Sequence, residues 1–389
     1  MPTSVGVLSK AAFRKWGKQT SWPTAGATFP VTNAAAGHGI PILSESFTSE
    51  FERDAIDTLY AKAGRNAGQI VTKMHRGNII CQGMYNNFGQ IIACAMGYEC
   101  PNDSGSSYHG SPEASSGKYI HIYELDEILA EDDWASAERL PTGAGGGTWT
   151  SADDKVRFGS LFFDKQVSSW VFTPVMWDKM IFQANFGRVT FQFDGLAQDH
   201  QRSAVNYAST NWSLASDKRR LLMSNATFSI GSLDGTTLSY AARGITDFEL
   251  ILERGLAADQ DTASTVYIKE PQINQSRKIY GSFSLSRYEN DNYLDTIDAD
   301  KPCRAQLSFV SGGYVFQIYM PNMTIKTPDH TTKGSSILRP KYNFELAKPA
   351  SDPWSGTSEY ANIQLVKLNE FWILTKNDDA TNWLRTDPS

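Results

Sequence analysis

Several short segments alternate apolar and polar residues, and this pattern most constrains what the chain can fold into. The clearest ladder covers 189–193, and comparable ladders lie at 248–252, 283–285 and 342–346. A period of two places one face of a strand against a core and the other face in solvent. We therefore expect a mainly β protein with a few short helices, built as a β-sandwich or barrel.

An apparent internal repeat is the second constraint. The segment 168–182 (SSWVFTPVMWDKMIF) resembles 311–325 (SGGYVFQIYMPNMTI), with aromatic, Val-Phe and Met residues in matching places. Trp170 and Tyr314 open the shared pattern, so the offset is 314 − 170 = 144 residues, about the length of one domain. Chance similarity between two apolar strands is the alternative interpretation.

A weaker repeat links SFTSEFERD, which begins at Ser46, with SFSLSRYEND, which begins at Ser282. Its offset is 282 − 46 = 236 residues, so the first half would carry an insertion of 236 − 144 = 92 residues. The predicted organisation is an N-terminal arm, two related domains, of which the first carries an insertion at about 55–155, and a C-terminal arm or added strand. In order, these four parts cover 1–45, 46–210, 211–350 and 351–389.

Few segments favour helices. Asn87 is expected to cap a helix over 88–96, and Gly97 to end it. Two further helices are expected over 55–63 and 124–134, the second of them acidic.

Composition excludes several classes of function. The chain has 389 residues, of which 41% are hydrophobic and 20% charged, and this is typical of a globular protein. Its net charge of −6 argues against binding of nucleic acid by the chain as a whole, because that needs a basic face. No P-loop, HExxH or Gly-x-Ser-x-Gly motif occurs. We therefore predict no catalytic residue, no metal ion and no cofactor.

The cysteines and histidines support the same interpretation. Cys81 and Cys94 lie in apolar runs and are expected to be small buried hydrophobic residues. The six histidines show no metal-binding spacing, so a catalytic role for any of them is not expected. No apolar run is long enough to span a bilayer and no secretory segment begins the chain, so we expect synthesis in a reducing cytoplasm and no membrane partner.

One local charge imbalance favours an interaction. Residues 1–44 contain no acid, and their basic residues are Lys10, Arg14, Lys15 and Lys18. We expect this stretch to be a basic arm that lies on an acidic neighbouring surface, with 124–134 as one candidate. An ordinary solvated face is the alternative.

Four segments then resemble a known family. They are FRKWGKQTSWPTAG (13–26), IPILSESF (40–47), GNIICQGMYNNFGQIIACAMGYE (77–99) and VRFGSLFFDKQ (156–166). Together with the Val-Phe-Met repeat, they resemble the tail tube, or major tail, proteins of long-tailed bacteriophages. The chain is longer than the simplest members and looks doubled.

The resemblance implies tandem tail-tube-type β-sandwich or barrel domains with a flanking helix. It also implies a structural role without enzymatic activity, in which stacked rings form the conduit for genome ejection. A doubled subunit would close a ring of pseudo-sixfold symmetry with three chains.

The expected partners follow from this role. They are further copies of the chain, other tail proteins (tape measure, terminator and distal tail proteins), and genomic DNA that passes the lumen without specific binding. The expected location is the virion tail. The residues predicted to contribute to assembly are Lys10, Arg14, Lys15, Lys18, Trp170, Phe172, Tyr314 and Phe316.

Two other functions remain open. A tail-tip or receptor-binding β-sandwich protein that recognises carbohydrate would use exposed tryptophans as stacking platforms, and burial in a core or an interface is the simpler role for each. The candidates are Trp22, Trp134, Trp149 and Trp212. The third hypothesis is a hydrolase whose site follows no short motif.

Overall fold

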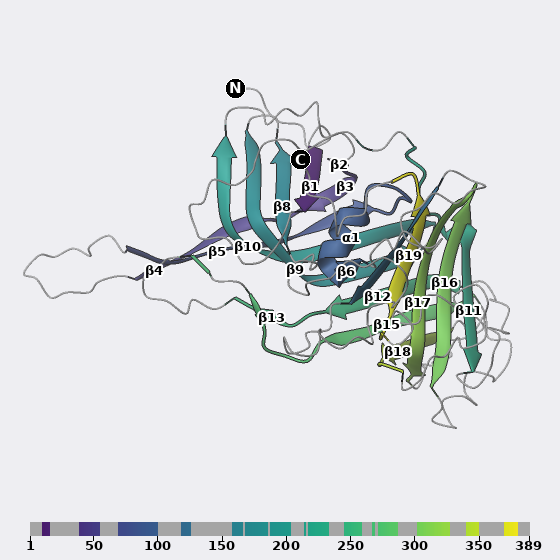
Figure 1. Ribbon diagram of the computed structural model, residues 1–389. Helices are drawn as coiled ribbons and strands as arrows, with labels where there is room; N and C mark the ends of the chain where they lie inside the picture. Colours follow the sequence, from purple (N-terminus) through teal and green to yellow (C-terminus); the bar gives the residue numbers. More distant parts are fainter. Residues whose placement is uncertain are drawn as a thin grey trace, which may run out of the picture.

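The computed structural model confirms a mainly β chain with very few helices (Figure 1). Among the residues that the structure describes, seventeen strands belong to one antiparallel sheet, and two short strands form a separate ribbon. The structure describes residues 10–15, 39–54, 69–99, 118–125, 158–165, 168–185, 187–203, 214, 217–232, 245–258, 267–268, 271–286, 302–326, 340–349 and 369–379.

The first layer is an antiparallel array of four strands, in the spatial order β1 (Lys10–Lys15), β8 (Gly159–Asp164), β9 (Ser169–Asn185) and β10 (Arg188–Ser203). The long strand β5 (Gln69–Gln82) continues the layer beyond β10. Three short strands complete it: β2 (Gly39–Ile40) pairs with β1, whereas β3 (Ile42–Glu45) and β4 (Thr48–Asp54) pair with β5.

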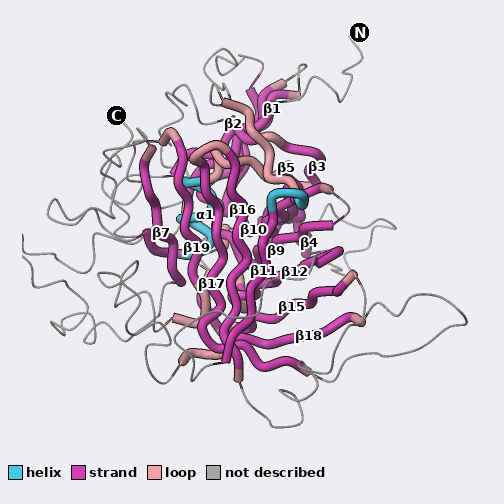
Figure 2. The backbone as a smooth tube through the Cα atoms, turned by 90° about the vertical axis from the view of Figure 1, so that its right-hand side faces the viewer, coloured by secondary structure: helices cyan, strands magenta, loops and turns pink. Residues whose placement is uncertain are grey.

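The second layer has the same core arrangement. Its strands are β11 (Ala226–Ser232), β16 (Cys303–Ser311), β17 (Tyr314–Ile325) and β19 (Trp372–Asn377), followed by β7 (Tyr119–Leu125) and β6 (Gly97–Glu99). Figure 2 shows β7, β19, β17, β16 and β11 side by side.

Three strands join the two layers through the path β9–β12–β15–β18–β17. They are β12 (Ile245–Glu253), β15 (Lys278–Leu285) and β18 (Lys341–Leu346). The sheet therefore bends back on itself and encloses a core, which gives a β-sandwich-like fold (Figure 1). The separate ribbon consists of β13 (Leu256–Ala257) and β14 (Gln272–Ile273).

The alternating ladders all fall in strands, as predicted. The ladder at 189–193 lies in β10, that at 248–252 in β12, that at 283–285 in β15 and that at 342–346 in β18. Both segments of the stronger repeat, 168–182 and 311–325, contribute a long strand to the middle of a layer.

The turn between β16 and β17 follows from its two glycines. Ser311 pairs with Tyr314, so only Gly312 and Gly313 connect the strands. Their φ values are 57° and 88°, a left-handed conformation that favours glycine and matches the twist of a two-residue hairpin.

The helix α1 (Gly89–Met96) lies between the two layers, and all eight of its residues are buried. Gly97 ends it as predicted, with a φ of 96° and an N–H that donates to the carbonyl of Ala93. The predicted cap is wrong: Phe88 occupies the N-cap position without a side-chain hydrogen bond. Asn87 has a φ of 75°, which is a turn conformation and not the extended one of a capping residue.

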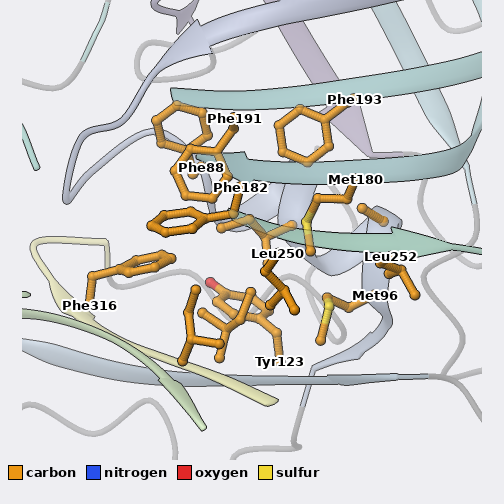
Figure 3. Close-up of a cluster of buried hydrophobic side chains, with 14 of the residues drawn as sticks. Phe88, Met96, Tyr123, Met180, Phe182, Phe191, Phe193, Leu250, Leu252 and Phe316 are labelled. Carbon is orange, nitrogen blue, oxygen red and sulfur yellow. The ribbon is translucent and has the colours of Figure 1, made fainter. Parts of the chain in front are cut away.

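One aromatic core connects the layers (Figure 3). Phe182 of β9 stacks on Phe316 of β17, with ring centroids 5.9 Å apart and planes at 11°. Phe191 of β10 contacts both rings, at 5.1 Å and 5.6 Å. The two halves of the chain thus share a continuous hydrophobic interior.

Residues 10–15 differ from the predicted arm. They form β1, which pairs along its whole length with β8 of the same chain. Ala11, Ala12 and Phe13 are buried, and this apolar triplet explains why the segment enters the sheet despite the basic residues around it.

The C-terminal segment supplies an added strand, but within its own chain, because β19 lies between β17 and β7. Glu124 and Leu125, expected to begin an acidic helix, instead end β7. The rest of 124–134 and the helix expected over 55–63 lie outside the described residues. In the part of the chain that the structure describes, no helix is long and apolar enough to cross a membrane.

Candidate functional site

The predicted assembly residues fall in three places. Phe172 is buried in β9, and Tyr314 and Phe316 are buried in β17, so packing within the chain accounts for their apolar character. Trp170 is partly buried against the same core. Their role in contacts between subunits stays a prediction.

Three of the four basic residues predicted to contribute to assembly lie in β1. The backbone of Lys10, Arg14 and Lys15 belongs to β1, and the structure does not describe their side chains. Lys18 lies outside the described residues, as do the four candidate sugar platforms Trp22, Trp134, Trp149 and Trp212.

Two of the predicted residues, Trp170 and Phe172, lie beside a pair of histidines. The imidazole rings of His75 and His200 are 4.7 Å apart between centroids. Phe172 stacks on His200 at 5.9 Å and approaches His75 at 6.2 Å. Phe51 also contacts His75, edge-on at 6.1 Å between centroids.

Strand pairing brings these side chains together. His75 of β5 lies opposite Ser49 of β4 and opposite Ala197 of β10. His200 of β10 lies opposite Phe172 of β9. Four strands thus converge on one group of rings at the base of the β4–β5 ribbon.

A carboxylate completes the group. His75, Asp199 and His200 each offer one ligand atom, and these three atoms lie within 4.8 Å of one another. Oδ1 of Asp199 accepts a hydrogen bond from the backbone N–H of His200 at 2.8 Å. The hydroxyl oxygen of Ser49 is 3.3 Å from Nδ1 of His200. We refer to His75, Asp199 and His200 as the histidine cluster.

His75 is the unusual member of the histidine cluster. Its side chain is fully buried, and neither ring nitrogen has a hydrogen-bond partner among the described residues. Leaving a buried polar group unsatisfied costs about 1–3 kcal/mol. Burial lowers the pKa of His75 to about 4, with further contributions from His200 and Lys73. The ring is therefore neutral near pH 7, the form that binds metal ions.

Neighbouring charges shift the pKa of His200 in opposite directions. Burial lowers its pKa most, the positive charges of Arg202 and Lys73 lower it further, and Asp199 opposes them. Both cations contact aromatic residues. The Lys73 ammonium lies 4.9 Å from the ring centroid of Tyr267 and donates to its hydroxyl at 3.4 Å, and the Arg202 guanidinium lies 4.2 Å from the ring centroid of Trp170.

The histidine cluster could not be predicted from the sequence, because its members are far apart in the chain. The spacing between the two histidines is 200 − 75 = 125 residues, which no short metal-binding motif covers. The pairing of β5 with β10 brings them together, and a single sequence gives no direct signal for that pairing.

A second polar group fixes the C-terminal strand. The hydroxyl of Tyr314 donates to Oδ2 of Asp378 at 2.5 Å, and Lys118 forms an ion pair with the same carboxylate. The Lys118 ammonium also lies 3.8 Å from the ring centroid of Tyr314. Asn86 adds two hydrogen bonds to Asp378, one through its side-chain nitrogen and one through its side-chain oxygen. The predicted assembly residue Tyr314 therefore has a structural role within the chain.

The ribbon of β4 and β5 has an open edge among the described strands. Figure 1 shows it extending away from the body of the molecule. β4 pairs with β5 on one edge, and its other edge has no partner strand among the described residues. Phe51 on this strand is 44% exposed, and the ion pair between Arg76 and Glu50 lies at the surface.

Comparison with models of known protein families and with curated proteins gave no match.

Proposed function

We propose that the chain is a structural subunit of a bacteriophage tail tube, with two tube-type units in each chain and three chains in each ring. In this role the protein assembles and has no catalytic turnover. Its partners are further copies of itself and other tail proteins, and DNA passes through the ring without specific binding.

The observation that carries the proposal is the repeated strand array. β1–β8–β9–β10 and β11–β16–β17–β19 have the same order and are antiparallel throughout. The β8–β9 hairpin begins at Gly159, and the β16–β17 hairpin begins at Cys303. Their offset of 303 − 159 = 144 residues equals that of the sequence repeat. Both hairpins also have a register shift near this end, at Gly159/Leu161 and at Cys303/Ala305.

Open strand edges supply a means of assembly. β4 pairs only with β5, and β11 pairs only with β16, among the described strands. An unpaired edge recruits another strand, and a soluble protein with such edges either protects them or uses them for association. A closed ring in which each subunit pairs its edges with its neighbours leaves no open edge for uncontrolled aggregation.

Charge supports the passage of DNA. A net charge of −6 gives the chain little capacity to hold phosphate groups, so a lumen built from such subunits would let DNA slide. Basic side chains in a lumen would bind DNA with a strong dependence on salt.

The test is electron microscopy of the purified full-length protein with rotational averaging of end-on views, together with the mass of the ring. We expect rings or tubes with six density lobes and a mass of three chains per ring. Rings of six chains would overturn the doubled-subunit proposal while keeping the tube. A protein that stays monomeric at high concentration, with and without a tail-initiating complex, would overturn the tube function and favour a receptor-binding β-sandwich protein.

A further inference from the structure

We propose that His75, Asp199 and His200 bind one divalent transition-metal ion of the zinc class. This inference is independent of the tail-tube proposal, because it concerns a site within a single chain.

The geometry is close to that of a metal centre. Two imidazoles and one carboxylate form a ligand set that zinc accepts, with metal–ligand distances of about 2.0–2.2 Å. Ligands at that distance in a tetrahedral site are about 3.3 Å apart. The three ligand atoms of the histidine cluster lie within 4.8 Å of one another, so small side-chain rotations bring them to a common ion.

The buried ring of His75 gives the independent reason to expect a ligand. Both of its nitrogens lack a hydrogen-bond partner among the residues that the structure describes, although the side chain is fully buried. Buried polar groups in folded proteins nearly always have a partner. A metal ion would satisfy one nitrogen of this ring.

The surroundings orient the other histidine. The Ser49 hydroxyl contacts Nδ1 of His200, so Nε2 is the ring nitrogen that remains for a metal. A hydrogen bond to the ring nitrogen that does not bind the metal commonly fixes the orientation of a metal-binding histidine. Asp199 and His200 are only partly buried, so solvent can reach the ion and complete its coordination.

The charges near the histidine cluster give the proposal a distinctive test. The positive charge of Lys73 acts on both His75 and His200, and a cation bound there would be repelled by it. Removing this charge should therefore strengthen metal binding, whereas removing a ligand should weaken it. If these residues had only a structural role, removing Lys73 and removing a ligand would not change metal binding in opposite directions.

The experiment uses the full-length protein, freed of metal with a chelator and titrated with zinc chloride by calorimetry at pH 7.5. Cobalt chloride provides a second probe, because its absorption spectrum reports the ligands. We expect one zinc ion per chain. His200→Ala should abolish this site, Asp199→Asn should weaken it by at least about tenfold, and Lys73→Gln should tighten it.

Asp194→Asn is the matched control for Asp199→Asn, because it lies on the same strand outside the histidine cluster. It should leave the stoichiometry and affinity unchanged. Equal zinc binding by the wild type and by Asp199→Asn, or binding that Lys73→Gln does not tighten, would overturn the proposal. If His200→Ala does not fold, these two conservative variants still decide the question.

Discussion

The indole of Trp372 stacks on the ring of Tyr319, with centroids 3.7 Å apart and planes at 13°. The pair joins β19, near the C-terminus, to β17 in the middle of the second layer. Both side chains are fully buried and are surrounded by Ile120, Ile122 and Leu374. This small second core packs β19 against β17 and β7, two strands that come from distant parts of the chain.

Trp372→Ala should therefore destabilise the protein by about 3–5 kcal/mol, because it removes a large buried aromatic side chain and leaves a cavity. Urea unfolding followed by circular dichroism measures the change. Val310→Ala is the control, because Val310 is 54% exposed, and it should change the stability by no more than about 0.5 kcal/mol. Equal effects of the two substitutions would contradict the importance of the stacked pair.

If the chain assembles into rings as proposed, Phe51→Lys should prevent or weaken ring formation without unfolding the subunit. Phe51 lies on the open edge strand β4 and is 44% exposed, and a lysine on such an edge opposes pairing with another strand. Electron microscopy and the sedimentation of the assembled protein measure the effect. Val310→Lys places the same charge on another exposed residue, at the end of β16. Normal assembly of the Phe51 variant would exclude the β4 edge as a contact.

Asp194→Asn should raise the melting temperature at pH 7 and not at pH 3. Burial raises the pKa of Asp194 above its usual value, although Gln192 and Lys179 act in the opposite direction. A raised pKa in the folded state means that the charged carboxylate disfavours folding at neutral pH, and that this penalty disappears as the pH falls through the folded pKa. We expect a gain of about 1 kcal/mol or less, because the group is only partly buried. A lower melting temperature at pH 7 would contradict this assignment.

Gly281→Ala should destabilise the fold by more than about 2 kcal/mol. A Cβ atom at this position of β15 would lie 2.1 Å from the carbonyl oxygen of Glu249 in the neighbouring strand, and a backbone atom cannot move aside cheaply. Gly187→Ala is the matched comparison, because a Cβ there would meet nothing within 4 Å. Its φ of 86° still imposes a penalty, expected at about 1 kcal/mol. Chemical denaturation of both variants should rank them in this order.

The sequence predicts the strands better than it predicts their neighbours. Alternation of apolar and polar residues is a local signal, so the ladder at 342–346 could be assigned to a strand before its partners were known. The partners of β18 are β15 and β17, and nothing local in its sequence selects them. The path that joins the two layers therefore could not be predicted.

In the segment around Phe13, the basic residues and the apolar residues predict different structures. Its basic residues favoured an arm on the surface, but three consecutive buried apolar residues place it inside the first layer. Asn87 shows a similar limit, because its residue type suits a cap while its backbone is in a turn. The histidine cluster was missed for a third reason: its chemistry depends on a pairing between strands that are more than a hundred residues apart.

The position of β19 has a consequence for synthesis. β7 pairs on one edge with β19, a strand that begins 372 − 125 = 247 residues after β7 ends. The second layer consequently cannot be completed before residues 372–377 are synthesised, and a product that ends before them would lack the strand between β17 and β7. If the chain assembles as proposed, the synthesis of β19, rather than of the first half, sets the earliest moment at which a subunit can join its neighbours.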